Sequence, residues 1–105
     1  MQEISVHELQ TRINAADVPL LLDVRESWEF ALCHIDGSTS IPMGTIPDVL
    51  DDLNPLQETI VICHHGVRSR HVCQYLAHAG FSNLHNLTGG LQAWAVEIDT
   101  QMPTY

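Results

Sequence analysis

The feature that most constrains the fold is a strand pattern, a short loop and a helix pattern that follow one another in residues 59–79. Residues Thr59-Ile60-Val61-Ile62 are β-branched and uncharged, which is typical of a strand buried on both faces in a parallel sheet. From about Arg70 to Ala79 apolar residues recur at helical spacing, and Gly80 follows as a C-terminal cap. The seven residues between them, Cys63-His64-His65-Gly66-Val67-Arg68-Ser69, therefore form a tight loop at the carboxyl end of a strand. Open α/β sheets place ligand sites there.

The rest of the chain alternates strand and helix patterns in the same way. Short strands are predicted at 20–24, 40–43 and 83–87. Helices are predicted at 6–16, where Ser5 and Glu8 form a capping box, and at 27–32, 46–53 and 91–94. With 105 residues, the chain is long enough for one domain with a proper hydrophobic core and too short for two domains. The pattern predicts a single α/β domain over residues 1–105, with a mainly parallel four- to five-stranded sheet and helices on both faces.

The loop places a cysteine among groups that favour the thiolate over the thiol. Backbone N–H groups of a tight loop and of a helix start attract anions, and Arg68 adds a positive charge. Gly66 is suited to a positive φ, which turns backbone N–H groups inward. Cys63 is therefore predicted to be a nucleophile that meets an anionic substrate or leaving group. Cys33 and Cys73 have no such neighbours in sequence, and we predict that both are unreactive.

The charge balance limits the partners that the chain can bind. It has 13 acidic residues against four arginines and no lysine, a formal net charge of −9, so nucleic acids and anionic membranes are poor partners. Two of the four arginines, Arg68 and Arg70, lie in or beside the loop. No stretch is long and apolar enough to span a membrane, and residues 1–3 lack the pattern of a signal peptide. The three cysteines show no disulfide spacing, and we expect a cytoplasmic protein.

Five short motifs, taken in order, resemble the rhodanese-homology domain of the single-domain sulfurtransferase type. They are Asp23-Val24-Arg25 with Glu29-Phe30, His34-Ile35-Asp36-Gly37-Ser38, Ile41-Pro42, the loop Cys63–Ser69, and Leu87-Thr88-Gly89-Gly90-Leu91-Gln92-Ala93-Trp94. Each motif is weak alone, but the ordered set covers nearly the whole chain and is specific. One departure is Cys33, which stands where the family often has a glycine before His-Ile. It puts a second thiol at this turn, which we expect to lie away from the site.

The resemblance implies a thiosulfate sulfurtransferase that works in two steps. The Cys63 thiolate would take the outer sulfur of thiosulfate or of another persulfide donor. The resulting persulfide would pass the sulfur to cyanide, a thiol or a cysteine of a partner protein, with a sulfur-carrier protein among such partners. The donor and the persulfide would be bound by the loop residues His64, His65, Gly66, Val67, Arg68 and Ser69. The resemblance implies neither a cofactor nor a metal.

Two residues outside the loop are expected to support it. Asp23 resembles the family's aspartate that hydrogen-bonds near the base of the loop, and we predict a structural role for it rather than an acid–base role. Arg25 stands four residues before Glu29 across a strand–helix junction, and we predict an ion pair between them. The roles of His64 and His65, the oligomeric state and the order of residues 99–105 stay open at this point.

Three other functions compete with sulfur transfer. Cysteine-dependent phosphatases and arsenate reductases place five residues between cysteine and arginine to hold a tetrahedral anion, whereas four separate Cys63 from Arg68. A metal site would need ligand pairs at zinc-like spacing, which the histidines around the loop do not offer. A non-enzymatic docking or regulatory module of the same fold is the main alternative, although the presence of Cys63 argues against it.

Overall fold

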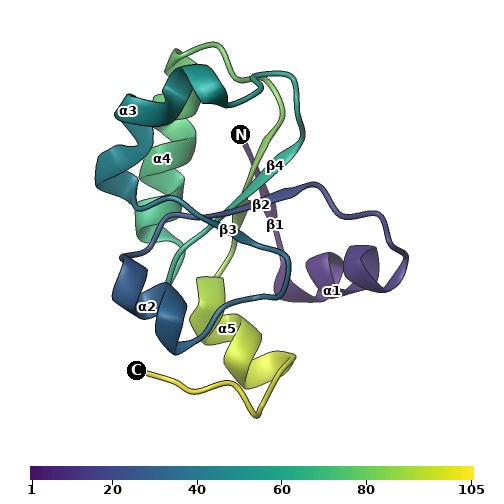
Figure 1. The fold of residues 1–105 in the computed structure, drawn as a ribbon. Helices are drawn as coiled ribbons and strands as arrows, with labels where there is room; N and C mark the ends of the chain where they lie inside the picture. Colours follow the sequence, from purple (N-terminus) through teal and green to yellow (C-terminus); the bar gives the residue numbers. More distant parts are fainter.

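Five short strands form one parallel sheet in the computed structural model, which describes residues 1–105 (Figure 1). They are β1 (Gln2–Ile4), β2 (Leu20–Asp23), β3 (Thr39–Ser40), β4 (Thr59–Ile62) and β5 (Leu84–Leu87). Their order across the sheet is β1-β5-β4-β2-β3. The strand that leads into the cysteine loop is therefore the central one, and the predicted parallel α/β sheet is confirmed.

Five α-helices connect or follow these strands. They are α1 (Val6–Asn14), α2 (Ser27–Leu32), α3 (Ile46–Val49), α4 (Val67–His78) and α5 (Gly90–Glu97), with 3-10 turns η1 (Met43–Thr45) and η2 (Leu50–Asp52) on either side of α3. The predicted capping box is present, because the Ser5 hydroxyl accepts the N–H of Glu8 and the Glu8 carboxylate accepts the N–H of Ser5.

Five elements differ from the sequence prediction. The helix α4 begins at Val67 rather than near Arg70, so its first turn takes in the end of the predicted loop, and α5 spans Gly90–Glu97 rather than 91–94. The predicted strand at 40–43 is only Thr39–Ser40, because its partner β2 ends at Asp23, which is in register with Ser40. The predicted helix at 46–53 is α-helical only to Val49 and then tightens into η2. The strand β1 was not predicted; it pairs with β5 at the edge of the sheet.

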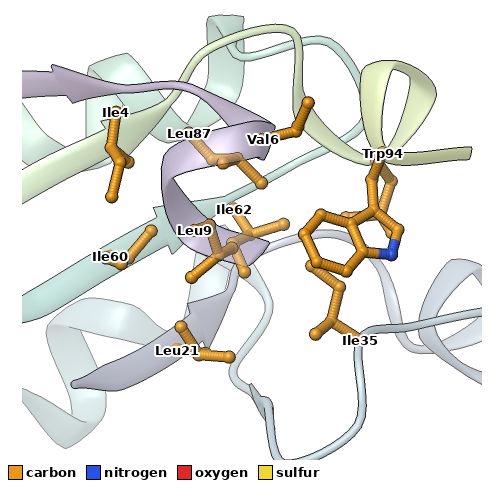
Figure 2. Packing of buried hydrophobic residues seen from close by; sticks show 10 residues of the cluster. Ile4, Val6, Leu9, Leu21, Ile35, Ile60, Ile62, Leu87 and Trp94 are labelled. Atoms are coloured by element: carbon orange, nitrogen blue, oxygen red, sulfur yellow. The ribbon is translucent and has the colours of Figure 1, made fainter. Parts of the chain in front are cut away.

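Alternation along the strands builds two hydrophobic cores, one on each face of the sheet. On one face α1 and α5 pack against the sheet, and Figure 2 shows Leu9 and Trp94 on either side of Ile62. On the other face α3 and α4 pack against Val61 and its neighbours. Burying each such side chain contributes about 1.5–3 kcal/mol. Cys63 belongs to this second core, so the alternation that buries β4 also points the thiol toward α4.

The carboxyl edge of the sheet gathers the motifs that the sequence analysis singled out. Asp23 is in register with Ile62, so the chain segments after β2 and β4 leave the sheet side by side. The first turn of α5 packs on the loop from the other side. There the N–H of Leu91 donates to the carbonyl of Cys63 at 2.9 Å, and that of Gln92 donates to the carbonyl of His64 at 3.0 Å. None of the helices has the length and apolar character that crossing a membrane requires.

Candidate active site

The Cys63 sulfur lies on the floor of the loop and accepts two backbone hydrogen bonds. The N–H of Gly66 donates to Sγ at 3.1 Å, and the N–H of Ser69 donates to it at 3.3 Å. Gly66 has φ +99°, the left-handed conformation expected of it, and caps the start of α4. An alanine there would be strained, and its Cβ would lie 3.3 Å from the Leu87 carbonyl oxygen. Cys63 as a whole is only 1% exposed, so its sulfur and the two N–H groups are shielded from solvent.

A buried chain of side chains supports the loop from below. Cys63 Sγ lies 3.3 Å from the Ser69 hydroxyl, which in turn donates to Oδ1 of Asn86. The amide nitrogen of Asn86 donates to the Gly66 carbonyl at 3.2 Å and to Glu3 at 3.0 Å. Because both of those partners are acceptors, the orientation of the Asn86 amide is determined, and Oδ1 must face Ser69.

Asn86 and Glu3 were not among the predicted site residues. Asn86 is fully buried in β5, and its only signal in the sequence was a polar residue within a predicted strand. Buried side-chain amides are nearly always hydrogen-bonded. Here the Asn86 amide donates to the carbonyl of Gly66, whose backbone N–H donates to the Cys63 sulfur. Glu3 carried no signal, because it lies in the unpredicted strand β1.

Arg68 forms a bidentate ion pair with Glu29 of α2. Its Nη1 and Nη2 lie 2.7 and 2.9 Å from the two carboxylate oxygens. The hydrogen bonds from Arg68 lower the pKa of Glu29 to about 2, against the opposing effect of burial. The predicted ion pair between Arg25 and Glu29 is therefore wrong, because the Glu29 carboxylate faces the loop and pairs with Arg68.

Arg25 pairs instead with Asp23, two residues earlier. Its Nη2 lies 2.7 Å from Oδ2 of Asp23, and its Nε lies 2.9 Å from Oδ1. A further bond runs from Nη2 to the carbonyl of Cys33 at 2.7 Å. Arg25 is fully buried, and a buried guanidinium requires a carboxylate close by. Asp23 thus bonds to Arg25 and to no residue of the loop.

His64 and His65 lie on the outer side of the loop. Their rings stack with centroids 4.1 Å apart, and the ring of Tyr105 packs on His64 at 4.0 Å. Nε2 of His64 lies 3.4 Å from the side-chain oxygen of Gln92. Burial lowers the pKa of His64, although the contact with Gln92 acts in the opposite direction. Val67 is 57% exposed, so its side chain faces solvent rather than the sulfur.

The other two cysteines are free and buried. Burial raises the pKa of Cys73 to about 11, in keeping with the unreactive thiol expected within α4. Cys33 lines a crevice with His64 and Tyr105 that is too narrow for a water molecule. Cys33 therefore lies next to His64, the residue that follows Cys63, and is closer to the site than predicted from the sequence.

A family model described as "Rhodanese-like domain" matches residues 5–97, and the chain belongs to this family. The "Putative sulfurtransferase YtwF" of Bacillus subtilis (strain 168) is 39% identical over 97 residues, which cover 92% of this chain and 93% of that protein. The crystal structure of a rhodanese-like domain protein from Staphylococcus aureus superposes with TM-score 0.84 at 35% identity, covering 90% of this chain and 91% of that one. The family that the motifs resembled is thus confirmed, and so is its fold.

Some relatives are much longer than this chain. The "Rhodanese-like/PpiC domain-containing protein 12, chloroplastic" of Arabidopsis thaliana is 36% identical over 112 residues, which cover 100% of this chain and only 38% of that protein. The domain therefore occurs both nearly alone and as one part of a larger chain.

Proposed function

We propose that this domain is a sulfurtransferase that takes a sulfane sulfur from thiosulfate or a persulfide donor and carries it on Cys63. The observation that carries the proposal is the pair of backbone N–H groups on Sγ. Donors fixed in this way stabilise negative charge on sulfur, first on the thiolate and then on the persulfide. Membership of the rhodanese-like family, with a relative named as a sulfurtransferase, supports the same chemistry.

In the first step the Cys63 thiolate attacks the outer sulfur of thiosulfate. A bond forms between the two sulfur atoms, the bond between the outer sulfur and the sulfonate breaks, and sulfite leaves with its electron pair. Cys63 then carries a persulfide with one negative charge. The loop with four residues between Cys63 and Arg68 suits this single added sulfur better than a phosphoryl group.

In the second step an acceptor removes the outer sulfur of the persulfide. Cyanide attacks that sulfur, the sulfur–sulfur bond breaks, and thiocyanate and the Cys63 thiolate are released. A thiol or a cysteine of a partner protein, such as a sulfur carrier, would attack in the same way. The net charge of −9 favours a partner with a basic surface, and we place the reaction in the reducing cytoplasm, where the thiol is maintained.

Arg68 contributes less free charge than an isolated arginine would. Its bidentate pair with Glu29 balances one charge with another, so the backbone N–H groups carry most of the attraction for the donor. The Nε–H of Arg68 makes no hydrogen bond within the chain and remains to bind the sulfonate oxygens. His65 and Val67 are the exposed residues of the loop, and we assign them contact with the outer part of the donor.

Intact-protein mass spectrometry after incubation with thiosulfate tests the proposal. We expect a gain of about 32 Da, one sulfur atom, that cyanide removes and that is absent from Cys63→Ser. Cys73→Ser is the matched control and should gain the same mass as the native chain. If neither thiosulfate nor a persulfide-carrying protein loads Cys63, the sulfurtransferase function is refuted, and the docking module takes its place.

A further inference from the structure

Tyr105 is bound by side-chain contacts to both ion pairs that flank the loop. Its hydroxyl donates to the Glu29 carboxylate at 2.6 Å and accepts from Nη1 of Arg25 at 2.9 Å. The chain returns past α5 toward α2 to reach this position (Figure 1). Tyr105 thus lies 80 residues from Arg25 in sequence and in direct contact with it in space.

The chemistry of its two partners determines how the Tyr105 hydroxyl is hydrogen-bonded. A guanidinium only donates and a carboxylate only accepts, so the hydroxyl must accept from Arg25 and donate to Glu29. Burial, followed by the bond to Glu29, raises the pKa of Tyr105 to about 12, which keeps the proton in place. Tyr105 therefore joins the pair Asp23–Arg25 to the pair Glu29–Arg68.

The Glu29 carboxylate has four hydrogen bonds, two on each oxygen. Oε1 accepts from Arg68 and from the N–H of Glu26, and Oε2 accepts from Arg68 and from Tyr105. A carboxylate bonded in this way is held against rotation, and it holds the guanidinium of Arg68 in turn. Loss of the tyrosine hydroxyl frees one side of this carboxylate and leaves Nη1 of the buried Arg25 without its shortest hydrogen bond.

The ring of Tyr105 makes a second, separate contact with the loop. It packs on the imidazole of His64, the residue that follows the cysteine, with ring centroids 4.0 Å apart. The ring of Trp28 also contacts the ring of Tyr105 in an edge-to-face arrangement, with ring centroids 5.6 Å apart. The ring therefore limits the movement of His64 and shields it from water, independently of the hydroxyl.

We propose that Tyr105 is a positioning residue that holds the loop in its anion-binding arrangement, through Glu29 and Arg68 by its hydroxyl and through His64 by its ring. The inference rests on the proposed function in one respect, which is that the anion bound there is the sulfur donor. Tyr105 makes no contact with the Cys63 sulfur, so it acts through the other residues. The two contacts predict two separable effects.

Tyr105→Phe removes the hydroxyl and keeps the ring. Tyr75→Phe is the matched control, because Tyr75 is 41% exposed against 39% for Tyr105 and its hydroxyl makes no hydrogen bond in the chain. We expect Tyr105→Phe to lower kcat/KM for thiosulfate about tenfold, mainly through KM. The value of kcat/KM for dithiothreitol, a neutral acceptor, should stay unchanged, and Tyr75→Phe should match the native chain.

Tyr105→Ala removes the ring as well and should change the titration of His64. His65 in the loop, Glu29 of α2, Arg68 of α4 and Gln92 of α5 act on the same imidazole and are unchanged in both variants. Since burial is the main cause of the lowered pKa of His64, its pKa should rise toward the ordinary value in Tyr105→Ala. NMR titration should show no such rise in Tyr105→Phe.

Alkylation of Cys63 separates failure of this inference from failure of the proposed function. Iodoacetate is an anion and iodoacetamide is neutral, so the ratio of their rates at Cys63 measures anion binding by the loop without any sulfur transfer. We expect this ratio to fall severalfold in Tyr105→Phe and not in Tyr75→Phe. An unchanged ratio in a folded Tyr105→Phe overturns the inference. If the ratio falls in Tyr105→Phe but thiosulfate does not load Cys63 even in the native chain, Tyr105 still positions the loop. The anion that the loop binds is then not the sulfur donor.

Discussion

Replacement of Gly90 by alanine should separate α5 from the cysteine loop. Gly90 is the first residue of α5 and is buried against the loop. A Cβ at this position would lie 2.3 Å from the carbonyl oxygen of Cys63 and 2.5 Å from that of His64, both inside the 3.0 Å below which real Cβ contacts do not occur. Both obstacles are backbone atoms, so no side chain can turn away to make room.

The magnitude follows from what must move. If α5 is displaced, the hydrogen bonds from Leu91 to the Cys63 carbonyl and from Gln92 to the His64 carbonyl lengthen beyond 2.9 and 3.0 Å. Each backbone group left without a partner in a buried place costs about 1–3 kcal/mol. The residue also has φ +59°, which costs an alanine about 1–2 kcal/mol. We expect a loss of about 3–8 kcal/mol, a large part of the roughly 5–15 kcal/mol that stabilises such a domain.

Urea denaturation of three alanine variants isolates the clash from other effects. Gly44→Ala has open space around its Cβ and should change little. Gly37→Ala has open space but φ +85°, so it should lose only about 1 kcal/mol from backbone strain. If Gly90→Ala is within about 1 kcal/mol of Gly37→Ala, the close packing of α5 on the loop is refuted.

Three further predictions concern single groups at or near the site. The pKa of Glu29 is lowered from an ordinary 4.5 to about 2, so its contribution to stability is complete above pH 4.5 and is lost as the pH falls from there to about 2. Glu29→Gln should therefore show a flatter dependence of unfolding free energy on pH in that range, and parallel curves for the two proteins would contradict this. Ser69→Ala removes the donor to the buried Oδ1 of Asn86 and should cost about 1–3 kcal/mol in urea denaturation. It should still load sulfur from thiosulfate, because the backbone N–H groups on the sulfur remain; unchanged stability would argue against the hydrogen bond to Asn86. The pKa of Cys73 near 11 predicts that iodoacetamide at pH 8 labels Cys73 only after unfolding. If peptide mass spectrometry finds the label on Cys73 in the native Cys63→Ser protein, α4 opens in the folded state.

The elements that could be predicted from the sequence are those whose signals are local. The strand β4, the loop and α4 follow from four β-branched residues, a glycine and a helical repeat, all within about 20 residues. The strand β1 has no such signal. Its residues Gln2 and Glu3 are exposed, and it is a strand because its backbone pairs with β5, more than 80 residues away. Pairing of that kind depends on the folded sheet and not on the propensities of three residues.

The ion pairs at the site show the same limit more clearly. Spacing along the chain suggested Arg25 with Glu29, yet each has a different partner. A guanidinium that is fully buried must place all its N–H groups on acceptors, and one carboxylate four residues away cannot meet that need. Asp23, a main-chain carbonyl and the hydroxyl of Tyr105 together do so. Once Arg25 is satisfied in this way, the Glu29 carboxylate is available for Arg68, 39 residues further along. The charge balance at the loop therefore depends on which carboxylate each arginine pairs with. These pairings, and the contact of Tyr105 with Arg25, form only in the folded chain.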